Sequence, residues 1–252
     1  MIKVVLIGAG NVACHLYKAF KKADAVEVVQ WYNRSTHAII QYQNETEICD
    51  KINNLKDADV YIIAISDDAI TNVSRKLPFN DKLVVHTSGS LNIHGLDKKN
   101  RRGVFYPLQT FSKDVELDFS NVPFCIEVLE KKDLPILKQL AEQIYSPFYK
   151  INSEQRQILH LAAVYVNNFT NQLYRIAHEI SDIKNINFDI LKPLISETAN
   201  KVQNVSPYLA QTGPALRNDK KTINKHLKLL DNETHKEIYK LLTKAIQETH
   251  GK

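Results

Sequence analysis

A glycine-rich turn close to residue 1 has the residue types and spacing of a dinucleotide-binding loop. The apolar run Ile2–Ile7 is followed directly by the segment Gly8-Ala9-Gly10-Asn11-Val12-Ala13. In such a G-x-G-x-x-G/A pattern the first glycine permits a tight turn, the second lets the backbone approach a pyrophosphate, and the last small residue lets a helix pack on the sheet. The helix N-terminus also offers free N–H groups to phosphate. The motif predicts cofactor contacts at Gly8, Ala9, Gly10, Asn11 and Val12; the alternative is a strand–helix turn without a ligand.

The end of the next apolar run indicates which dinucleotide is bound. NAD-binding domains place an acid there for the ribose 2′-hydroxyl, but this run ends in Asn33-Arg34-Ser35. Arg34 offers a fixed positive charge that suits a 2′-phosphate, with Asn33 and Ser35 as additional donors. These three residues predict NADP as the cofactor; the alternative is that Arg34 is a solvated loop residue.

Two further loops follow predicted strands at the edge where such cofactors bind. One contains Ile65, Ser66 and Asp67, and the other contains Thr87 and Ser88. We expect all five to contact the cofactor, and Ser88 also to take part in catalysis. Helix capping by Ser66 or Asp67, and a turn held by local side-chain-to-backbone bonds at residues 86–90, are the alternatives.

A polar stripe lies along a mostly apolar helical segment in the second half of the chain. Asn167 falls within about 20° of His160 on the circumference of an ideal helix. Polar side chains on a buried helix need hydrogen-bond partners, either in the protein or in a ligand. We therefore take His160 as the catalytic acid or base and Asn167 as a residue that orients substrate; a satisfied core histidine is the alternative.

A loop farther along the chain contributes one more candidate. Arg217 follows Thr212-Gly213-Pro214, which forces a non-helical turn. An arginine at this place is suited to binding a substrate carboxylate through two parallel hydrogen bonds. The alternative is a helix-connecting turn with an Arg–Asp pair.

The elements that must position these residues divide into two parts. Short apolar strands alternate with helices at first, which predicts a doubly wound, mainly parallel α/β sheet of the Rossmann type over residues 1–150. Residues 151–252 have helical periodicity and no convincing strand. The strands are expected at residues 2–7, 26–32, 60–65, 83–87, 103–106, 124–128 and 148–151, and the helices at 12–22, 39–52, 70–77, 134–145, 153–181, 188–205 and 218–247.

Composition excludes several other classes of protein. The chain has 252 residues, 24% of them charged, and a net charge of +5 without a dense basic stripe, so nucleic acid is not an expected partner. No apolar stretch approaches the length of a membrane span, and Val4–Ile7 is too short for a signal peptide. Three cysteines without metal-ligand spacing fit a reducing compartment, so we expect a cytoplasmic protein without a metal site.

The order of motifs resembles one family over nearly the whole chain. A Rossmann-like domain is followed by Tyr106-Pro107-Leu108-Gln109-Thr110-Phe111, then His160, Asn167 and Asn168, and then Thr212-Gly213-Pro214-Ala215 with Arg217 and Asp219. This looks like a family of NADP oxidoreductases with a C-terminal domain of unknown function, distantly similar to pyrroline-5-carboxylate reductase, ketopantoate reductase and 6-phosphogluconate dehydrogenase. The resemblance implies a helical domain of the 6-phosphogluconate dehydrogenase type, a homodimer formed through it, and a site in the cleft between the domains.

One departure from better-known relatives concerns the proton donor. β-Hydroxyacid dehydrogenases resemble this layout and use a helix lysine four residues before an asparagine, but here Ala163 and Val164 precede Asn167 and Asn168 by four. His160 is then the available acid or base, and it is suited to work near neutral pH. The sequence predicts an NADP-dependent oxidoreductase acting on a small, anionic carbonyl, imine or alcohol. A non-catalytic NADP(H)-binding sensor or regulatory dimer is the main alternative, and an empty Rossmann scaffold that binds nucleic acid is a weaker one.

Overall fold

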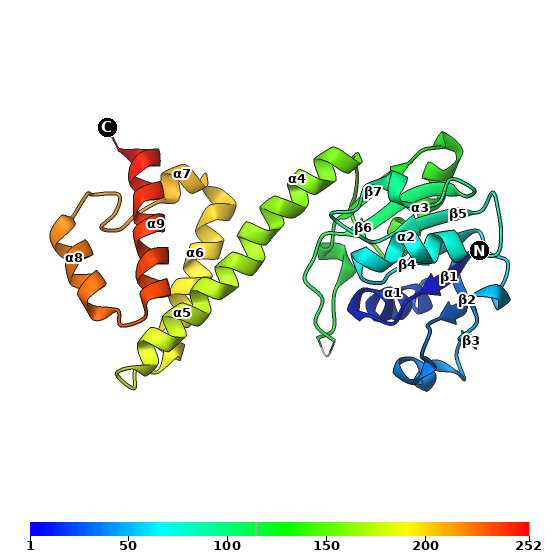
Figure 1. Ribbon diagram of the computed structural model, residues 1–252, viewed down its shortest axis with the longest axis horizontal. Coiled ribbons are helices and arrows are strands. Elements are labelled where there is room, and N and C mark those ends of the chain that lie inside the picture. Colours follow the sequence, from blue (N-terminus) through cyan, green and yellow to red (C-terminus); the bar gives the residue numbers. More distant parts are fainter. Residues whose placement is uncertain (114, 252) are drawn as a thin grey trace. The chain divides into compact units, whose positions relative to one another are not determined.

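The computed structural model describes residues 1–113 and 115–251. Contacts between Cα atoms divide the chain into two compact units, Met1–Asn167 and Asn168–Lys252 (Figure 1). The predicted domain boundary at residue 150 lies just before a helix that, by these contacts, belongs with the first unit. We describe the two units separately.

The first unit is built on one eight-stranded sheet. Its strand order is β3-β2-β1-β4-β5-β6-β7-β8, with every neighbouring pair parallel except β6 and β7. This is the Rossmann order 3-2-1-4-5-6 with two added strands, and the doubly wound, mainly parallel fold is confirmed. The strands are β1 (Ile2–Ile7), β2 (Val26–Tyr32), β3 (Ile48–Cys49), β4 (Val60–Ile63), β5 (Leu83–His86), β6 (Arg101–Pro107), β7 (Phe124–Val128) and β8 (Phe148–Lys150).

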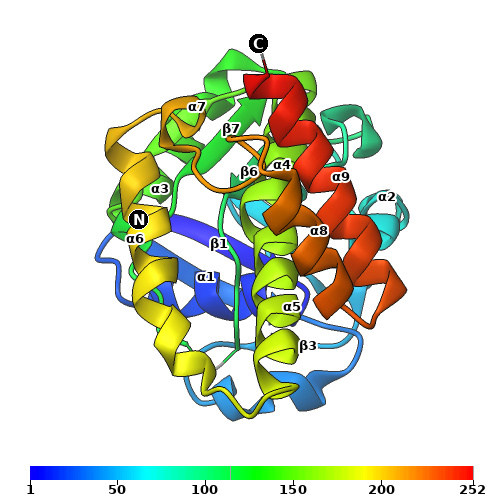
Figure 2. The same ribbon diagram turned by 90° about the vertical axis from the view of Figure 1, so that its left-hand side faces the viewer.

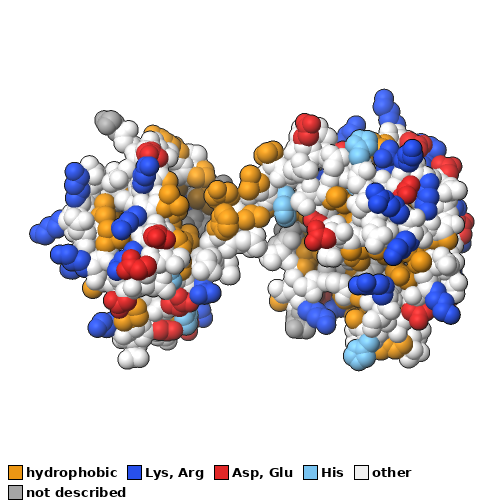
Figure 3. All heavy atoms as spheres, in the orientation of Figure 1, with side chains coloured by type: hydrophobic (Ala, Val, Ile, Leu, Met, Phe, Trp, Pro, Cys, Tyr) orange, Lys and Arg blue, Asp and Glu red, His pale blue; other side chains and the backbone are white. Residues whose placement is uncertain are grey.

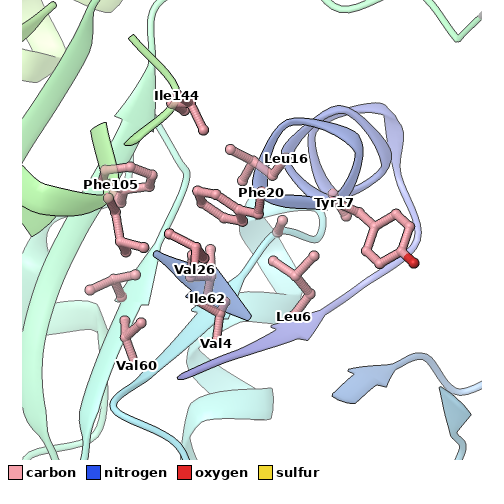
Figure 4. Close-up of a cluster of buried hydrophobic side chains, with 14 of the residues drawn as sticks. Val4, Leu6, Leu16, Tyr17, Phe20, Val26, Val60, Ile62, Phe105 and Ile144 are labelled. Carbon is pink, nitrogen blue, oxygen red and sulfur yellow. The ribbon is translucent and has the colours of Figure 1, made fainter. Parts of the chain in front are cut away.

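Helices cover both faces of this sheet, which is why the central strands are mostly apolar. In β1, Val4 and Leu6 pack into one buried cluster while Val5 and Ile7 pack into another, because successive side chains point to opposite faces. The first cluster lies under α1 (Asn11–Lys21) and α3 (Leu134–Gln143), and the second under α2 (Asp67–Lys76). Figure 4 shows Phe20 of α1 among the strand side chains of the first cluster.

One long helical run leads from the first unit into the second. The helix α4 (Ser153–Ala163) continues through a π-helical turn at Val164–Phe169 into α5 (Thr170–Asp182). The second unit is helical throughout the residues described, as expected from the sequence (Figure 2). Its other helices are α6 (Lys192–Asn204), α7 (Pro207–Ala210), α8 (Lys220–Leu229) and α9 (Glu233–His250).

Two helix predictions are wrong. Residues 39–52 form short 3-10 turns and the edge strand β3 instead of a helix, because Ile48 pairs with Trp31 of β2 and the hydroxyl of Thr46 bonds the carbonyl of Val28. The predicted helix 218–247 is two helices, α8 and α9. The chain breaks between them because Asn232 caps α9 by accepting a hydrogen bond from the amide of His235, 3.1 Å away.

Candidate cofactor and active site

The turn after β1 can be occupied only by glycine. Gly8 has a φ of +115°, and a Cβ atom built there would lie 2.2 Å from the carbonyl oxygen of Ala64, which follows β4. The indole Nε1 of Trp31 donates to the Gly8 carbonyl oxygen at 2.6 Å, so β2 also holds this turn. The turn therefore sits where the strand order reverses, between β1 and β4, which is the ligand-binding edge of this fold.

The second glycine of the motif has a different reason to be small. Gly10 is the N-cap residue of α1, and a Cβ there would meet no atom of the protein within 4 Å. The protein's own packing does not require glycine at this position, whereas the approach of a pyrophosphate to the first amides of α1 does. The site therefore fits a dinucleotide. Next to it, the side-chain amide of Asn11 donates to the carbonyl of Phe111 at 2.7 Å, which leaves its backbone N–H for a phosphate.

The end of β2 presents one exposed cation. Asn33 turns inward along the loop, where its side-chain amide donates to the carbonyl of Ser35 at 2.7 Å. Arg34 is exposed, and within residues 1–113 and 115–251 its guanidinium has no acceptor at hydrogen-bond distance. An arginine held on a short loop without a protein partner can bind a phosphate at no cost in broken ion pairs.

In the loop after β4, Ile65 and Asp67 contact neighbouring segments, whereas the side chain of Ser66 makes no capping hydrogen bond. Ile65 packs against Gly8, whose built Cβ would lie 2.5 Å from the Ile65 Cγ2 atom. Asp67 accepts a hydrogen bond from the hydroxyl of Ser90 at 2.5 Å. Ser66 occupies the N-cap position of α2 but makes no capping hydrogen bond with its side chain. The helix-capping alternative for Ser66 therefore has no support, and its hydroxyl is exposed beside the glycine turn.

The loop after β5 is a turn held by its own side chains. The Ser88 hydroxyl oxygen accepts from the amides of Ser90 and Leu91, at 3.2 and 2.9 Å, and Thr87 lies 3.5 Å from the carbonyl of Ile63. This is the structural alternative that the sequence left open for Ser88. The role of Ser88 in catalysis stays a prediction, because its hydroxyl oxygen is engaged by backbone amides of its own loop.

The helix α4 is fastened to this loop by a buried arginine. The Arg156 side chain is fully buried, and it donates from Nη1 to Glu127 and from Nη2 to the carbonyl of Leu91, both at 2.5 Å. The side-chain amide of Gln157 donates to the Ser90 carbonyl at 2.9 Å, and the Ile93 amide donates to the Ser153 hydroxyl at 3.0 Å. The first turns of α4 are thus fixed against the carboxyl end of β5.

This anchoring places His160 over the same loop. The Nδ1 atom of His160 lies 3.1 Å from the Tyr106 hydroxyl, with the two rings edge to face. A Cβ built at Gly89 would lie 2.6 Å from His160 Nδ1 and 2.8 Å from Tyr106 Cζ, so the absence of a side chain at Gly89 makes room for both rings. His160 therefore lies half-buried in a cluster at the carboxyl edge of the sheet, with Tyr106 as its hydrogen-bond partner, and its role as acid or base stays a prediction.

The sequence did not identify Tyr106 as part of the site. The residue had one usable signal: it lies near the end of β6, a strand parallel to β5, so its position at the same edge as Thr87 follows from the topology. Burial raises the pKa of Tyr106 to about 12, and the nearby Arg156 acts against this rise. Tyr106 is therefore a neutral phenol at physiological pH.

A second histidine lies beneath the cluster. His86, at the end of β5, is completely buried and accepts a hydrogen bond on Nδ1 from the Ser88 amide at 3.1 Å. Burial, assisted by the charge of Arg156, lowers the pKa of His86 to about 3. It is neutral at physiological pH and supports the 88–91 turn.

The remaining candidates lie farther along the chain. Asn167 is exposed in the π-helical turn, and the count of 100° per residue that aligned it with His160 does not hold there, because a π turn advances by fewer degrees per residue. Arg217 is exposed in the second unit, in the loop before α8. Its charge helps to lower the pKa of Asp219, whose carboxylate caps that helix through Thr222. The roles of Asn167 and Arg217 in substrate binding stay predictions.

The sheet order, the glycine turn and the helical second unit define a Rossmann-type dinucleotide-binding fold with an all-α domain. Residues 122–246 match the family model for a domain of unknown function, DUF2520. The structure aligns with a Bacteroides fragilis protein described as "putative NADP oxidoreductase BF3122" at 39% identity and a TM-score of 0.88, covering 98% of each chain. The chain belongs to this family, as the sequence motifs indicated.

More distant structures share the fold. An imine reductase from Myxococcus stipitatus aligns at 15% identity with a TM-score of 0.64, covering 100% of this chain and 96% of the other. The pyrroline carboxylate reductase of Plasmodium falciparum aligns at 15% identity with a TM-score of 0.59, covering 97% and 98%. No protein with a curated description matches the sequence. Across the described residues, no helix has the length and apolar character to cross a membrane.

Proposed function

We propose that this protein is an NADP-dependent oxidoreductase that transfers a hydride between NADP(H) and a small carbonyl, imine or alcohol. One observation carries the proposal: His160 is held over Gly89 at the sheet edge that also bears the Gly8 turn. A side chain capable of acid–base chemistry is thus held at the same sheet edge as the glycine turn. The 39%-identical protein described as a "putative NADP oxidoreductase" supports the same activity.

The residues divide the work by position. Gly8, Ala9, Gly10, Asn11 and Val12 would bind the pyrophosphate, with Asn33, Arg34 and Ser35 at the 2′-phosphate and Ile65, Ser66, Asp67, Thr87 and Ser88 toward the nicotinamide. Bound NADPH supplies the hydride. His160 would donate the proton that the reduced carbonyl or imine takes up, or accept it in the reverse direction. Arg217 and Asn167 would orient the substrate, and the charge of Arg217 is the reason to propose an anionic one.

The choice of NADP over NAD is tested at Arg34. Replacing Arg34 by alanine is expected to reduce the preference for NADPH over NADH by about 10- to 150-fold, because one or more charge-assisted hydrogen bonds to the 2′-phosphate are lost. Calorimetric titration of both nucleotides measures it. Arg75→Ala is the matched control, since Arg75 is an exposed arginine on α2. Equal affinity of the wild-type protein for NADPH and NADH would contradict the assignment of NADP as the cofactor.

The reaction itself is tested by a substrate screen. Purified protein with NADPH is assayed at 340 nm against panels of keto acids, cyclic imines and imino acids, and with NADP against the corresponding alcohols and amines. Turnover of one class establishes the oxidoreductase. Tight NADPH binding with no turnover on any panel would instead favour the non-catalytic sensor.

We also propose that the second unit forms a homodimer. Its helices expose large apolar side chains, among them Leu229 at 65% and Leu241 at 66% exposure. Figure 3 shows hydrophobic side chains, in orange, on the face of this unit that it views. A hollow of about 290 Å³ is lined by apolar residues of α5, α8 and α9, among them Leu173, Ile176, Leu229, Ile238 and Leu242. An apolar hollow beside exposed apolar side chains is the kind of surface that subunit interfaces use. A second copy of the chain is the occupant that the family resemblance implies.

The dimer is tested by sedimentation. Analytical ultracentrifugation is expected to give the mass of two chains for the wild-type protein and of one chain for a Leu229→Asp, Leu242→Asp variant, because two buried carboxylates would be desolvated in the interface. Lys240→Ala, which changes an exposed residue of α9, is the control. A monomeric wild-type protein would refute the proposal.

A further inference from the structure

We infer that Tyr106 is a positioning residue that sets the tautomer of His160, with the ring proton on Nε2. The evidence for this inference is the contact between the two side chains. Its consequence for catalysis rests on the proposed function, in which His160 is the acid or base. The Tyr106 hydroxyl and His160 Nδ1 are 3.1 Å apart, and both residues belong to the first unit.

The burial of Tyr106 decides which group donates. The residue is buried near the end of β6, 9% exposed, so its hydroxyl group needs a hydrogen-bond partner inside the protein. Among the residues that the structure describes, His160 Nδ1 lies at hydrogen-bond distance from that hydroxyl. A phenol whose pKa is well above neutrality keeps its proton and donates it. Nδ1 is then the acceptor, and the neutral ring must carry its own proton on Nε2.

Gly89 keeps the two rings in contact. A methyl group at this position would lie 2.6 Å from His160 Nδ1 and 2.8 Å from Tyr106 Cζ, closer than any real Cβ contact. The backbone of the 88–91 turn therefore closes one side of the pair. The backbone carbonyls of Ser90 and Leu91 in that turn accept hydrogen bonds from Gln157 and Arg156 of α4. These bonds hold the helix that carries His160 against the turn.

The consequence is a directed proton donor. With Nδ1 occupied by Tyr106, Nε2–H is the ring group that remains for a substrate oxygen or nitrogen. No hydrogen-bond partner for Nε2 is found in the described part of the chain. Histidines in catalysis commonly need such a second group to fix which nitrogen carries the proton. Here a tyrosine has that role, where many enzymes use a carboxylate.

The tautomer is measured directly by NMR, with no substrate. Ring ¹⁵N shifts of the full-length protein are recorded at a pH where the histidines are neutral, and His160 is assigned from the signals missing in His160→Gln. We expect the Nε2–H form to predominate. In Tyr106→Phe the ratio of Nε2–H to Nδ1–H should fall by about 2- to 13-fold, which is the worth of one net hydrogen bond. Tyr149→Phe, at an exposed tyrosine on β8, should leave it unchanged.

A second variant, Gly89→Ala, tests the inference if Tyr106→Phe fails to fold. Gly89→Ala leaves both side chains in the protein but displaces one ring, so it should lower the same ratio. An unchanged ratio in folded Tyr106→Phe, or a wild-type ring protonated on Nδ1, would overturn the inference. Where the screen yields a substrate, Tyr106→Phe should lower kcat with KM and the NADPH Kd unchanged. If the wild-type protein turns over a substrate but Tyr106→Phe leaves the tautomer ratio unchanged, the oxidoreductase proposal is supported and the inference about Tyr106 is wrong. If the tautomer ratio changes as expected but no substrate is turned over, the inference about Tyr106 is supported and the oxidoreductase proposal is not.

Discussion

Replacing His160 by alanine is expected to lower kcat by about 10²- to 10⁴-fold, the usual contribution of a positioned acid or base. The Kd for NADPH should stay unchanged, because His160 contacts Gly89 and Tyr106 and is not part of the glycine turn. Steady-state kinetics on the substrate from the screen, together with calorimetric titration of NADPH, separate the two effects.

The control for this variant is His94→Ala, at an exposed histidine in the 3-10 turn Ile93–Gly95 of the same unit. It should retain full activity. A His160→Ala protein that turns over at the wild-type rate would remove His160 from the mechanism. A large loss of NADPH affinity in the same variant would show that the histidine acts in cofactor binding instead.

Replacing Arg156 by methionine is expected to lower the free energy of unfolding of the first unit by about 3–5 kcal/mol. That is the typical cost of removing one partner from a buried ion pair, since the other charge is left unpaired. Here Glu127, whose side chain is only 15% exposed, would lose the guanidinium, and the Leu91 carbonyl would lose a donor. Urea unfolding followed by tryptophan fluorescence reports on this unit, because Trp31 is fully buried in it.

The same variant should also affect the site, because Arg156 holds α4 against the 88–91 turn. We expect activity to fall together with stability, and a double replacement of Arg156 by methionine and Glu127 by leucine to recover part of the stability. Gln157→Ala is the matched control: it removes one exposed hydrogen bond from α4 to the Ser90 carbonyl and should cost no more than about 1.5 kcal/mol. An Arg156→Met protein as stable as the wild type would contradict this account.

Part of the helix pattern could not be read from the sequence because it depends on distant partners. Residues 39–52 have apolar spacing compatible with a helix, but Ile48 finds a strand partner in Trp31, and a two-residue strand is too short to leave a periodic pattern. The break between α8 and α9 depends on the local cap of Asn232, which the sequence contains but which helical periodicity alone overlooks. The π turn at Val164–Phe169 leaves no signal in the order of apolar residues.

The proposed cofactor site could be predicted from the sequence because its determinants are local. The strand β1, the φ of Gly8 and the start of α1 lie within a few residues of each other, and the pattern G-x-G-x-x-A describes all three. The missing acid after β2 and the presence of Arg34 are likewise read at one place in the chain. Parallel strands then bring the loops after β4 and β5 to the same edge, as the alternation of strands and helices implies.

The arrangement around His160, the proposed acid or base, depended on the tertiary structure. The Rossmann sheet, the glycine turn and the choice of His160 as a candidate could all be predicted from the order of residues, since each has a local pattern. The sequence did not predict the contact between His160 and Tyr106, which is 54 residues away. It also did not predict that the two rings occupy the space left by the absence of a side chain at Gly89. This contact depends on the folded chain, because the buried Arg156 holds α4 against β7 and the 88–91 turn. Packing between distant segments leaves no periodic trace in the order of residues.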